Sequence, residues 1–274
     1  MSNNSLEQFD SIEKKITEEI AKTFESKRKR IFSKIFGAAL GAIPWVGGLL
    51  NAVVDLKSGE GQVRKNELYE SWLSEHKAKL KLLAETLQSV TQRLDEFPEE
   101  INQRMESEEY LQIVRKSFKV WDNSDTQEKR ELVRRILTNS GTNKLVPDDL
   151  IRLFLDWINI YHEAHFSVIK IIYKQPGVSR LEIWQKLDGT EVQENSPEAD
   201  LFKLLIRDLS TGSVIRQERQ TDYYGNFIKK APKKNSSPSK TMKSAFDDEE
   251  GYELTELGQQ FVHYALNEAV PRIN

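Results

Sequence analysis

The stretch IFGAALGAIPWVGGLLNAVV, from Ile35 to Val54, contains no charged side chain, although charged residues make up 30% of the chain. As one straight helix it would run roughly 30 Å, about the thickness of a bilayer core. Pro44 removes a helical hydrogen bond, and the pair Gly47-Gly48 weakens the helix that follows. The pattern therefore predicts two short apolar helices, near 31–42 and 46–54, that form a hairpin.

An apolar hairpin of this kind buries its side chains in its own protein, in a partner or in a membrane. The basic run Lys27 to Arg30 precedes it. Such a run is typical of a solvated face, and it also suits lipid headgroups beside a membrane segment. Burial within a helical bundle and contact with a membrane or partner therefore remain as two alternatives. The candidate insertion residues are Phe36, Leu40, Ile43, Pro44, Trp45, Val46, Leu49 and Leu50.

Composition limits the remaining possibilities. The chain has 274 residues, a net charge of −3 and no cysteine. This length allows one large or two modest domains, and the absence of cysteine excludes disulfides and thiolate metal sites. The N-terminus is polar and acidic, and it shows no secretion signal. We expect a cytoplasmic protein, with membrane association through the hairpin as an open alternative.

Helical periodicity dominates the first 161 residues. Apolar residues recur three or four apart over 6–26, which predicts an amphipathic helix. A longer helix is expected over 63–96, where a heptad pattern predicts a coiled-coil-like seam. That seam either closes an intramolecular bundle or forms a homo-oligomer. Its members are Leu73, Leu80, Leu83, Leu87, Val90, Leu94 and Phe97.

Shorter helices follow the heptad segment. One stripe runs to Trp121, and Ser124 with Gln127 forms a capping-box pattern for a helix that ends near Asn139. The residues 140–143 predict a turn. Pro147 then opens a strongly apolar helix with acidic residues in its first turn, where the helix dipole favours them.

The last third of the chain carries three local patterns in sequence. These are PGVSRLEIWQKL at 176–187, LFKLLIRDLSTGSVIRQER at 201–219 and YELTELGQQFV at 252–262. Together they resemble the second helix, the third helix with its first wing strand, and the second wing strand with its closing helix of the winged-helix superfamily. The resemblance covers about 163–266. It implies helices, two wing strands and a helical cap at Thr255, whereas the N-terminal part resembles no family that we can name.

The predicted fold class is therefore mainly α. An N-terminal helical bundle, with the glycine-rich apolar hairpin and the long heptad-patterned helix, precedes a C-terminal winged-helix domain of α+β type. The expected boundaries are 1–62 for the amphipathic helix and hairpin, 63–161 for the long helix and bundle, and 162–274 for the winged helix. The last domain includes a long basic wing insertion at 220–251.

Catalytic signatures are missing from the sequence. It contains no phosphate-binding G-x-x-x-x-G-K-[ST] motif, no G-x-S-x-G motif and no cysteine nucleophile. His162 and His165 lie three apart and can share a helix face, but a closed zinc site needs more ligands. We therefore expect no enzyme activity, no cofactor and no metal.

Charge in the winged-helix region is unevenly placed. In proteins of this fold, the third helix enters the major groove and the wing contacts phosphates. Here the third helix offers three acids, Glu198, Asp200 and Asp208, against Lys203 and Arg207, which is unfavourable for sequence-specific DNA binding. The insertion is more suitable for nucleic acid or an acidic partner, although a solvated loop explains it equally simply. Its candidate binding residues are Lys229, Lys230, Lys233, Lys234, Lys240 and Lys243.

Two functional hypotheses follow. In the first, the chain is a non-enzymatic effector or interaction protein of bacterial type, whose hairpin inserts into a membrane or partner while the winged helix receives a protein or nucleic-acid signal. In the second, it is a cytoplasmic winged-helix regulator that binds DNA, and the hairpin is core or a dimer interface. Exposure of the hairpin discriminates between them.

Overall fold

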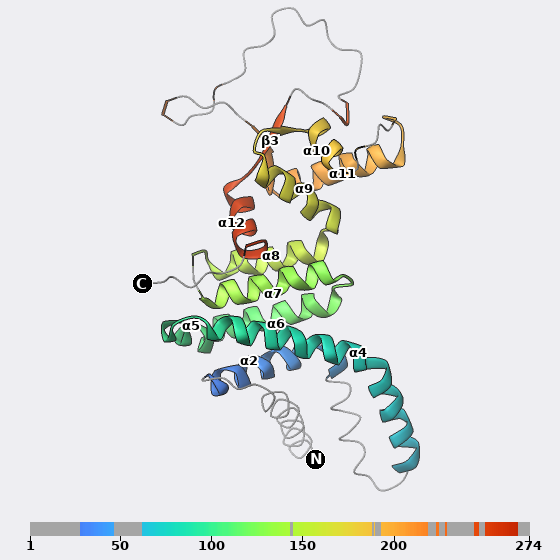
Figure 1. Ribbon diagram of the computed structural model, residues 1–274, viewed down its shortest axis with the longest axis vertical. Coiled ribbons are helices and arrows are strands. Elements are labelled where there is room, and N and C mark those ends of the chain that lie inside the picture. Colours follow the sequence, from blue (N-terminus) through green and yellow to red (C-terminus); the bar gives the residue numbers. More distant parts are fainter. Residues whose placement is uncertain are drawn as a thin grey trace, which may run out of the picture. The chain divides into compact units, whose positions relative to one another are not determined.

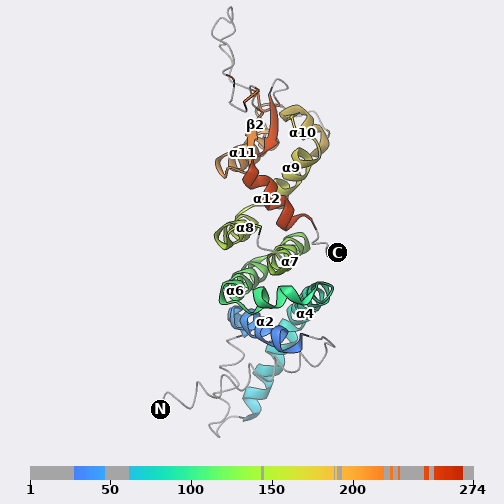
Figure 2. The same ribbon diagram turned by 90° about the vertical axis from the view of Figure 1, so that its left-hand side faces the viewer.

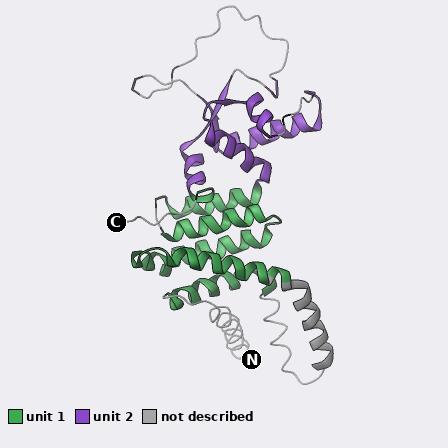
Figure 3. Cartoon of the chain, viewed as in Figure 1, with its two compact units in different colours: residues 1–160, 264–274 green, residues 161–263 purple. Residues whose placement is uncertain are grey.

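A computed structural model of the protein describes residues 28–46, 62–142, 145–187, 189, 193–218, 223–224, 228, 244–246 and 250–267, and the side chains of 62–77 and of residue 80 are not among them. The predicted amphipathic helix at 6–26 and the second half of the hairpin lie outside these residues. The described chain is mainly helical with one small antiparallel sheet, as the sequence predicts. It divides into two compact units, 1–160 with 264–274 and 161–263 (Figure 3).

Unit 1 is a stack of helices that packs around α6 (Glu108–Asn123), which contacts α2, α7 and α8 (Figure 1). The first half of the predicted hairpin forms α2. The other helices are α2 (Lys29–Gly41), α4 (Gln62–Asp95), the short 3-10 helix η1 (Glu99–Ile101), α5 (Asn102–Glu106), α7 (Gln127–Thr142) and α8 (Asp148–Ile160).

The heptad pattern of α4 serves burial within this unit. Of its described seam residues, Leu83, Leu87, Val90 and Leu94 are at most 1% exposed, whereas Phe97 is half-buried. Helix α4 packs against α7. Apolar side chains spaced three and four apart lie on one helix face, so a single neighbouring surface can cover them. The seam therefore needs no second copy of the chain over this part of its length.

Two local predictions in unit 1 are wrong. The cap of α7 is Thr126, whose hydroxyl accepts the Lys129 N–H at 3.3 Å, whereas the Ser124 hydroxyl donates to the Val120 carbonyl at 2.7 Å. The predicted turn at 140–143 is helical as far as Thr142. Gly141 lies there because a Cβ would come within 2.8 Å of the Tyr110 hydroxyl, so this glycine permits close packing rather than a turn.

Unit 2 combines helices with a three-stranded antiparallel sheet whose strand order is β1-β3-β2. Strand β2 and helix α11, which contact each other, are labelled in Figure 2. Ile215 pairs with Leu254, and Val178 pairs with Tyr252. The last two residues of α12 are assigned to unit 1. The elements are α9 (Glu163–Lys174), β1 (Val178–Ser179), α10 (Arg180–Leu187), α11 (Pro197–Thr211), β2 (Ile215–Gln217), β3 (Gly251–Leu254) and α12 (Glu256–Ala265).

Capping residues define the helix starts of unit 2. The Ser179 hydroxyl accepts the Glu182 N–H at 3.3 Å, and the Glu182 carboxylate accepts the Ser179 N–H at 2.8 Å, which is a capping box. The Thr255 hydroxyl accepts the Gly258 N–H at 3.0 Å, which confirms the predicted cap. Strand β1 is absent from our prediction because it is only two residues long, between a turn and a capped helix.

Candidate functional site

The candidate insertion residues on α2 and in the bend after it lie in the core of unit 1. Phe36, Leu40 and Ile43 are each 1% exposed, and Val46 is 2% exposed. Pro44 is exposed, whereas Leu49 and Leu50 lie outside the described residues. Helix α2 packs against α5 and α6. In the described part of the hairpin, the apolar side chains are therefore covered by the protein itself.

Trp45 is held at the end of the hairpin by polar contacts. Its indole N–H donates to Asp122 Oδ1 at 2.6 Å, and the Lys79 ammonium lies 5.6 Å from the indole ring centroid. Lys79 also forms an ion pair with Asp122 at 2.9 Å. Since a buried or half-buried indole N–H needs an acceptor, Asp122 fixes this residue within unit 1.

The basic run before the hairpin is not simply a solvated face. The Arg28 side chain is 7% exposed, and its guanidinium donates to the carbonyls of Leu94, Phe97 and Pro98 at 2.7–2.8 Å. It also donates to Asn102 Oδ1 at 2.6 Å. A planar guanidinium with several donors suits such a cluster of acceptors. Arg28 thus joins the start of α2 to the end of α4.

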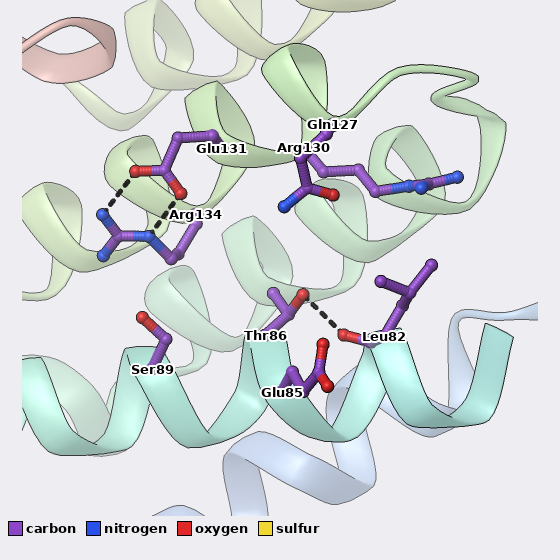
Figure 4. A pocket seen from close by; sticks show the side chains of 8 residues that line it. All are labelled: Leu82, Glu85, Thr86, Ser89, Gln127, Arg130, Glu131 and Arg134. Carbon is purple, nitrogen blue, oxygen red and sulfur yellow. Dashed lines mark hydrogen bonds and ion pairs between the residues drawn. The ribbon is translucent and has the colours of Figure 1, made fainter. Parts of the chain in front are cut away.

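One cavity of unit 1, of about 150 Å³, lies between α4 and α7 (Figure 4). Polar side chains of both helices line it, and most of the charged ones are paired with other groups of the protein. Arg134 donates to both carboxylate oxygens of Glu131 at 2.7–2.8 Å, and Arg130 donates to the Ser124 carbonyl while lying over the Trp121 ring. The lining residues are Leu82, Glu85, Thr86, Ser89, Gln127, Arg130, Glu131 and Arg134.

Glu131 illustrates this internal neutralisation. Burial raises the pKa of Glu131, but hydrogen bonds and charge from Arg134 and Arg135 outweigh it and hold the pKa below its ordinary value. The carboxylate is therefore ionised and already occupied by two arginines. A further cationic or anionic ligand would have to displace one of these pairs, so the cavity offers little free binding capacity.

The cavity of unit 2 has a different character. It measures about 410 Å³ and lies where α10, α11 and the sheet meet. Four cations and no acid are among the residues that line it. We call this site the cationic pocket, and it is lined by Arg180, Lys203, Ile206, Arg207, Ser210, Thr211, Ile215, Arg216, Gln217 and Tyr252.

The sheet side of the cationic pocket holds two arginines by specific contacts. Arg180 donates to the Tyr252 hydroxyl at 2.8 Å and lies over its ring at 5.5 Å from the centroid. Arg216 donates to Glu253 Oε1 at 2.7 Å across the β2–β3 pair. Tyr252 is 2% exposed, so it is a rigid support for the Arg180 guanidinium.

The α11 side supplies more weakly paired cations. Arg207 is 71% exposed, and its only described ion pair is with its sequence neighbour Asp208 at 3.7 Å. Lys203 lies 3.6 Å from Glu194 and from Asp200. Exposed pairs at such distances are worth at most about 1 kcal/mol. The charged side chains that line the cavity are all cations, and the pairs of Lys203 and Arg207 with neighbouring acids are weak enough for an anionic ligand to replace them at small cost.

The predicted lysine cluster of the insertion, Lys229 to Lys243, lies outside the described residues. The structure does show how the insertion returns to unit 2. Ala245 N–H donates to both carboxylate oxygens of Glu194 at 3.0–3.1 Å, and Ser244 also donates to this carboxylate. Phe246 stacks on Phe202 at 5.9 Å between ring centroids. The insertion is thereby anchored beside α11.

The histidine pair has a structural explanation. His165 Nδ1 accepts the His162 N–H at 3.1 Å, and the His165 ring stacks on Tyr161 at 4.9 Å. Burial lowers the pKa of His165, although the charge of Asp208 opposes this effect. Within the described ranges, no group of three histidine, aspartate or glutamate side chains is arranged to bind a metal ion.

None of the four cations of the pocket was among the binding residues predicted from the sequence: Lys203 and Arg207 were noted only as the bases of an acidic third helix, and Arg180 and Arg216 were overlooked. Arg180 begins α10 and Arg216 lies in β2, so only the folded unit brings them to one cavity. Strand β2 is too short to show an alternation that could have marked Arg216, since Ile215 is buried and both Arg216 and Gln217 are exposed. Comparison of this chain with models of known protein families, with curated proteins and with solved structures finds no match.

Proposed function

We propose that unit 2 is a winged-helix module that binds nucleic acid through phosphate groups, without reading the base sequence. The observation that carries this proposal is the cationic pocket, where Arg180, Lys203, Arg207 and Arg216 line one cavity that has no acid in its wall. Phosphate oxygens are the ligands that clustered arginines bind best, because a guanidinium donates two parallel hydrogen bonds. The protein acts by binding rather than by catalysis.

The order of elements supports the winged-helix part of the proposal. Helix α9, strand β1, helices α10 and α11, and the pair β2–β3 follow one another in the order expected for this fold, and β3 lies between β1 and β2. Helix α11 then corresponds to the third helix and residues 218–250 to the wing. The pocket lies beside α11 and includes Gln217 at the end of β2, from which the insertion begins, and this is the part of the fold that contacts the nucleic-acid backbone.

Acidic residues on α11 argue against sequence-specific recognition. Glu198 and Asp200 are exposed in the first turn, the part of a recognition helix that contacts base edges in a major groove. Phosphates on both sides of the groove would repel these carboxylates. The cations lie further along α11 from Lys203, at the start of α10 and on β2, where we expect them to contact the backbone and leave the bases unread.

Unit 1 supports the DNA-regulator hypothesis better than hairpin insertion. The described apolar residues of the hairpin are covered, and Trp45 is tied to Asp122. Within the described residues, none of the helices combines the length and the apolar character needed to cross a bilayer. Insertion would require α2 to leave the core, and burying a single side chain such as Phe36 is worth about 1.5–3 kcal/mol.

A salt titration tests the proposed function. The full chain should bind fluorescently labelled oligonucleotides of unrelated sequence with similar affinity, and the affinity should fall steeply as salt rises. The plot of log K against log salt has a negative slope, and each lost phosphate contact makes this slope shallower by about 0.7–0.9. The variants Arg207→Gln and Arg216→Gln should each make the slope shallower by about this amount.

The matched control is Arg115→Gln, which removes the same charge from unit 1, where Arg115 pairs with Glu108. This variant should leave the slope unchanged. Absence of binding at low salt, or equal effects of the unit 1 and unit 2 variants, would contradict the proposed function.

A further inference from the structure

Two neighbouring tyrosines at the start of the insertion are almost completely exposed. Tyr223 is 95% exposed and Tyr224 is 85% exposed. Their rings form an edge-to-face pair with centroids 5.6 Å apart and an interplanar angle of 87°. Exposing two adjacent large aromatic side chains forgoes the burial that normally stabilises them. A binding role explains their exposure.

The tyrosines lie within reach of the cationic pocket. Gln217, which lines the pocket, precedes Tyr223 by six positions along the chain, from 217 to 223. A fully extended chain covers at most about 3.6 Å per residue, so the two sites are within roughly 20 Å of each other. Proteins that bind single strands contact about 4–16 nucleotides with each domain, and a strand of that size spans both sites.

The surface of α11 is unsuited to the groove of a duplex. Its exposed side chains before the pocket are the acids Glu198 and Asp200 and the apolar residues Leu201 and Leu204, which are 52% and 36% exposed. None of these four donates a hydrogen bond to a base edge. An unpaired strand avoids this problem, because its backbone can follow the pocket while its bases turn toward aromatic side chains.

We infer that the nucleic acid bound by unit 2 is single-stranded, with its phosphates in the cationic pocket and unpaired bases stacked on Tyr223 and Tyr224. This inference rests on the proposed function of the pocket and narrows its ligand. Cations that follow the backbone together with aromatic rings that stack on bases are the general means of binding single strands without sequence preference. Every base has a flat face, so the recognition tolerates any sequence.

The test compares two probes, a labelled oligothymidylate of about 20 nucleotides and a mixed-sequence duplex of about 20 base pairs, each titrated with the full chain at one salt concentration. The wild-type protein should bind the single strand at least about tenfold more tightly than the duplex. The double variant Tyr223→Ala with Tyr224→Ala should lose about tenfold or more in affinity for the single strand. Its affinity for the duplex should stay within about twofold.

Two further variants separate stacking from a loss of structure. The double variant Tyr223→Phe with Tyr224→Phe keeps both rings and should bind the single strand as the wild type does. Tyr173→Ala removes a half-exposed tyrosine of α9 and should have no effect. Because the tyrosines carry no charge, the alanine variants should keep the salt slope of the wild type while the affinity falls.

The possible outcomes are distinguishable. If the duplex binds as tightly as the single strand and the alanine variants bind both normally, the single-strand inference is overturned while the proposed function stands. If the phenylalanine variants lose as much affinity as the alanine variants, stacking is overturned as the mechanism. If neither probe binds at low salt, the proposed function and this inference both fail.

Discussion

The two units use their most conspicuous residues in opposite ways. In unit 1 the apolar side chains of α2 and the arginine before it face inward: Phe36 is 1% exposed, and Arg28 contacts three backbone carbonyls. In unit 2 the arginines of the cationic pocket face outward, and Arg207 is 71% exposed. Residue type alone therefore does not distinguish a structural from a binding role. The distinction depends on where the side chain lies: the Arg28 guanidinium is enclosed by backbone carbonyls, whereas the Arg207 guanidinium is exposed at the wall of a cavity.

The largest expected effect is on the stability of unit 1, whose apolar side chains face inward. Phe36→Ala should destabilise unit 1 by about 3–5 kcal/mol, since it removes a fully buried aromatic ring and leaves a cavity. Denaturant unfolding measures this loss. The control is Leu145→Ala, because Leu145 is 61% exposed and its truncation should cost no more than about 0.5 kcal/mol. Equal stabilities of the two variants would show that the hairpin is not a core element.

Arginine provides a second, matched comparison between the units. Arg28→Met should cost about 3 kcal/mol, because it leaves the carbonyls of Leu94, Phe97 and Pro98 without their donor in a buried place. Arg207→Met should change the unfolding free energy by less than about 0.5 kcal/mol and should weaken nucleic-acid binding instead. Chemical denaturation and oligonucleotide titration of both variants measure this. The reverse pattern would invert the proposed roles.

The smallest expected effect is a pH dependence of unit 2. Burial lowers the pKa of His165, so the folded unit binds its proton less tightly than the unfolded chain does. As pH falls below about 6.5, the ordinary pKa of histidine, the unfolded state is protonated first and the folded state loses stability. Above that pH the imidazole is neutral in both states and this contribution is constant.

Amide hydrogen exchange in α9 and α11, measured near pH 7.5 and near pH 5.5 and corrected for intrinsic rates, detects this change. The destabilisation at the lower pH should be smaller in His165→Gln than in the wild type. His162→Gln, which alters an exposed imidazole, should behave as the wild type. An unchanged pH response in His165→Gln would assign the effect to other groups.

Elements with strong local signals could be predicted from the sequence. Thr255 and Pro147 lie at helix starts as expected, because a helix start depends on residues only a few positions apart. The heptad pattern likewise predicts α4 to within a residue at each end. These features follow from local chemistry, which a single sequence displays directly.

Features that depend on distant residues could not be predicted in this way. Arg28 lies in a basic run that is typical of a solvated face. Its hydrogen-bond acceptors, however, are 66–74 positions away in the sequence. Arg180 and Arg216 reach one pocket only through the pairing of β3 with β1 and β2.

One wrong prediction has a local cause. The predicted cap at Ser124 failed because Thr126 offers an equivalent hydroxyl two residues later.

The anchor of Ser244, Ala245 and Phe246 on α10, α11 and Glu194 has a consequence for how this protein can vary in length. Described contacts hold both ends of the insertion: the Glu218 N–H donates to the Gly251 carbonyl, and Ser244 and Ala245 donate to Glu194. Closing a loop twice as long costs only about 0.6 kcal/mol more. We therefore expect added or deleted sequence between these two ends, including a fused probe, to have a small effect on the stability of unit 2.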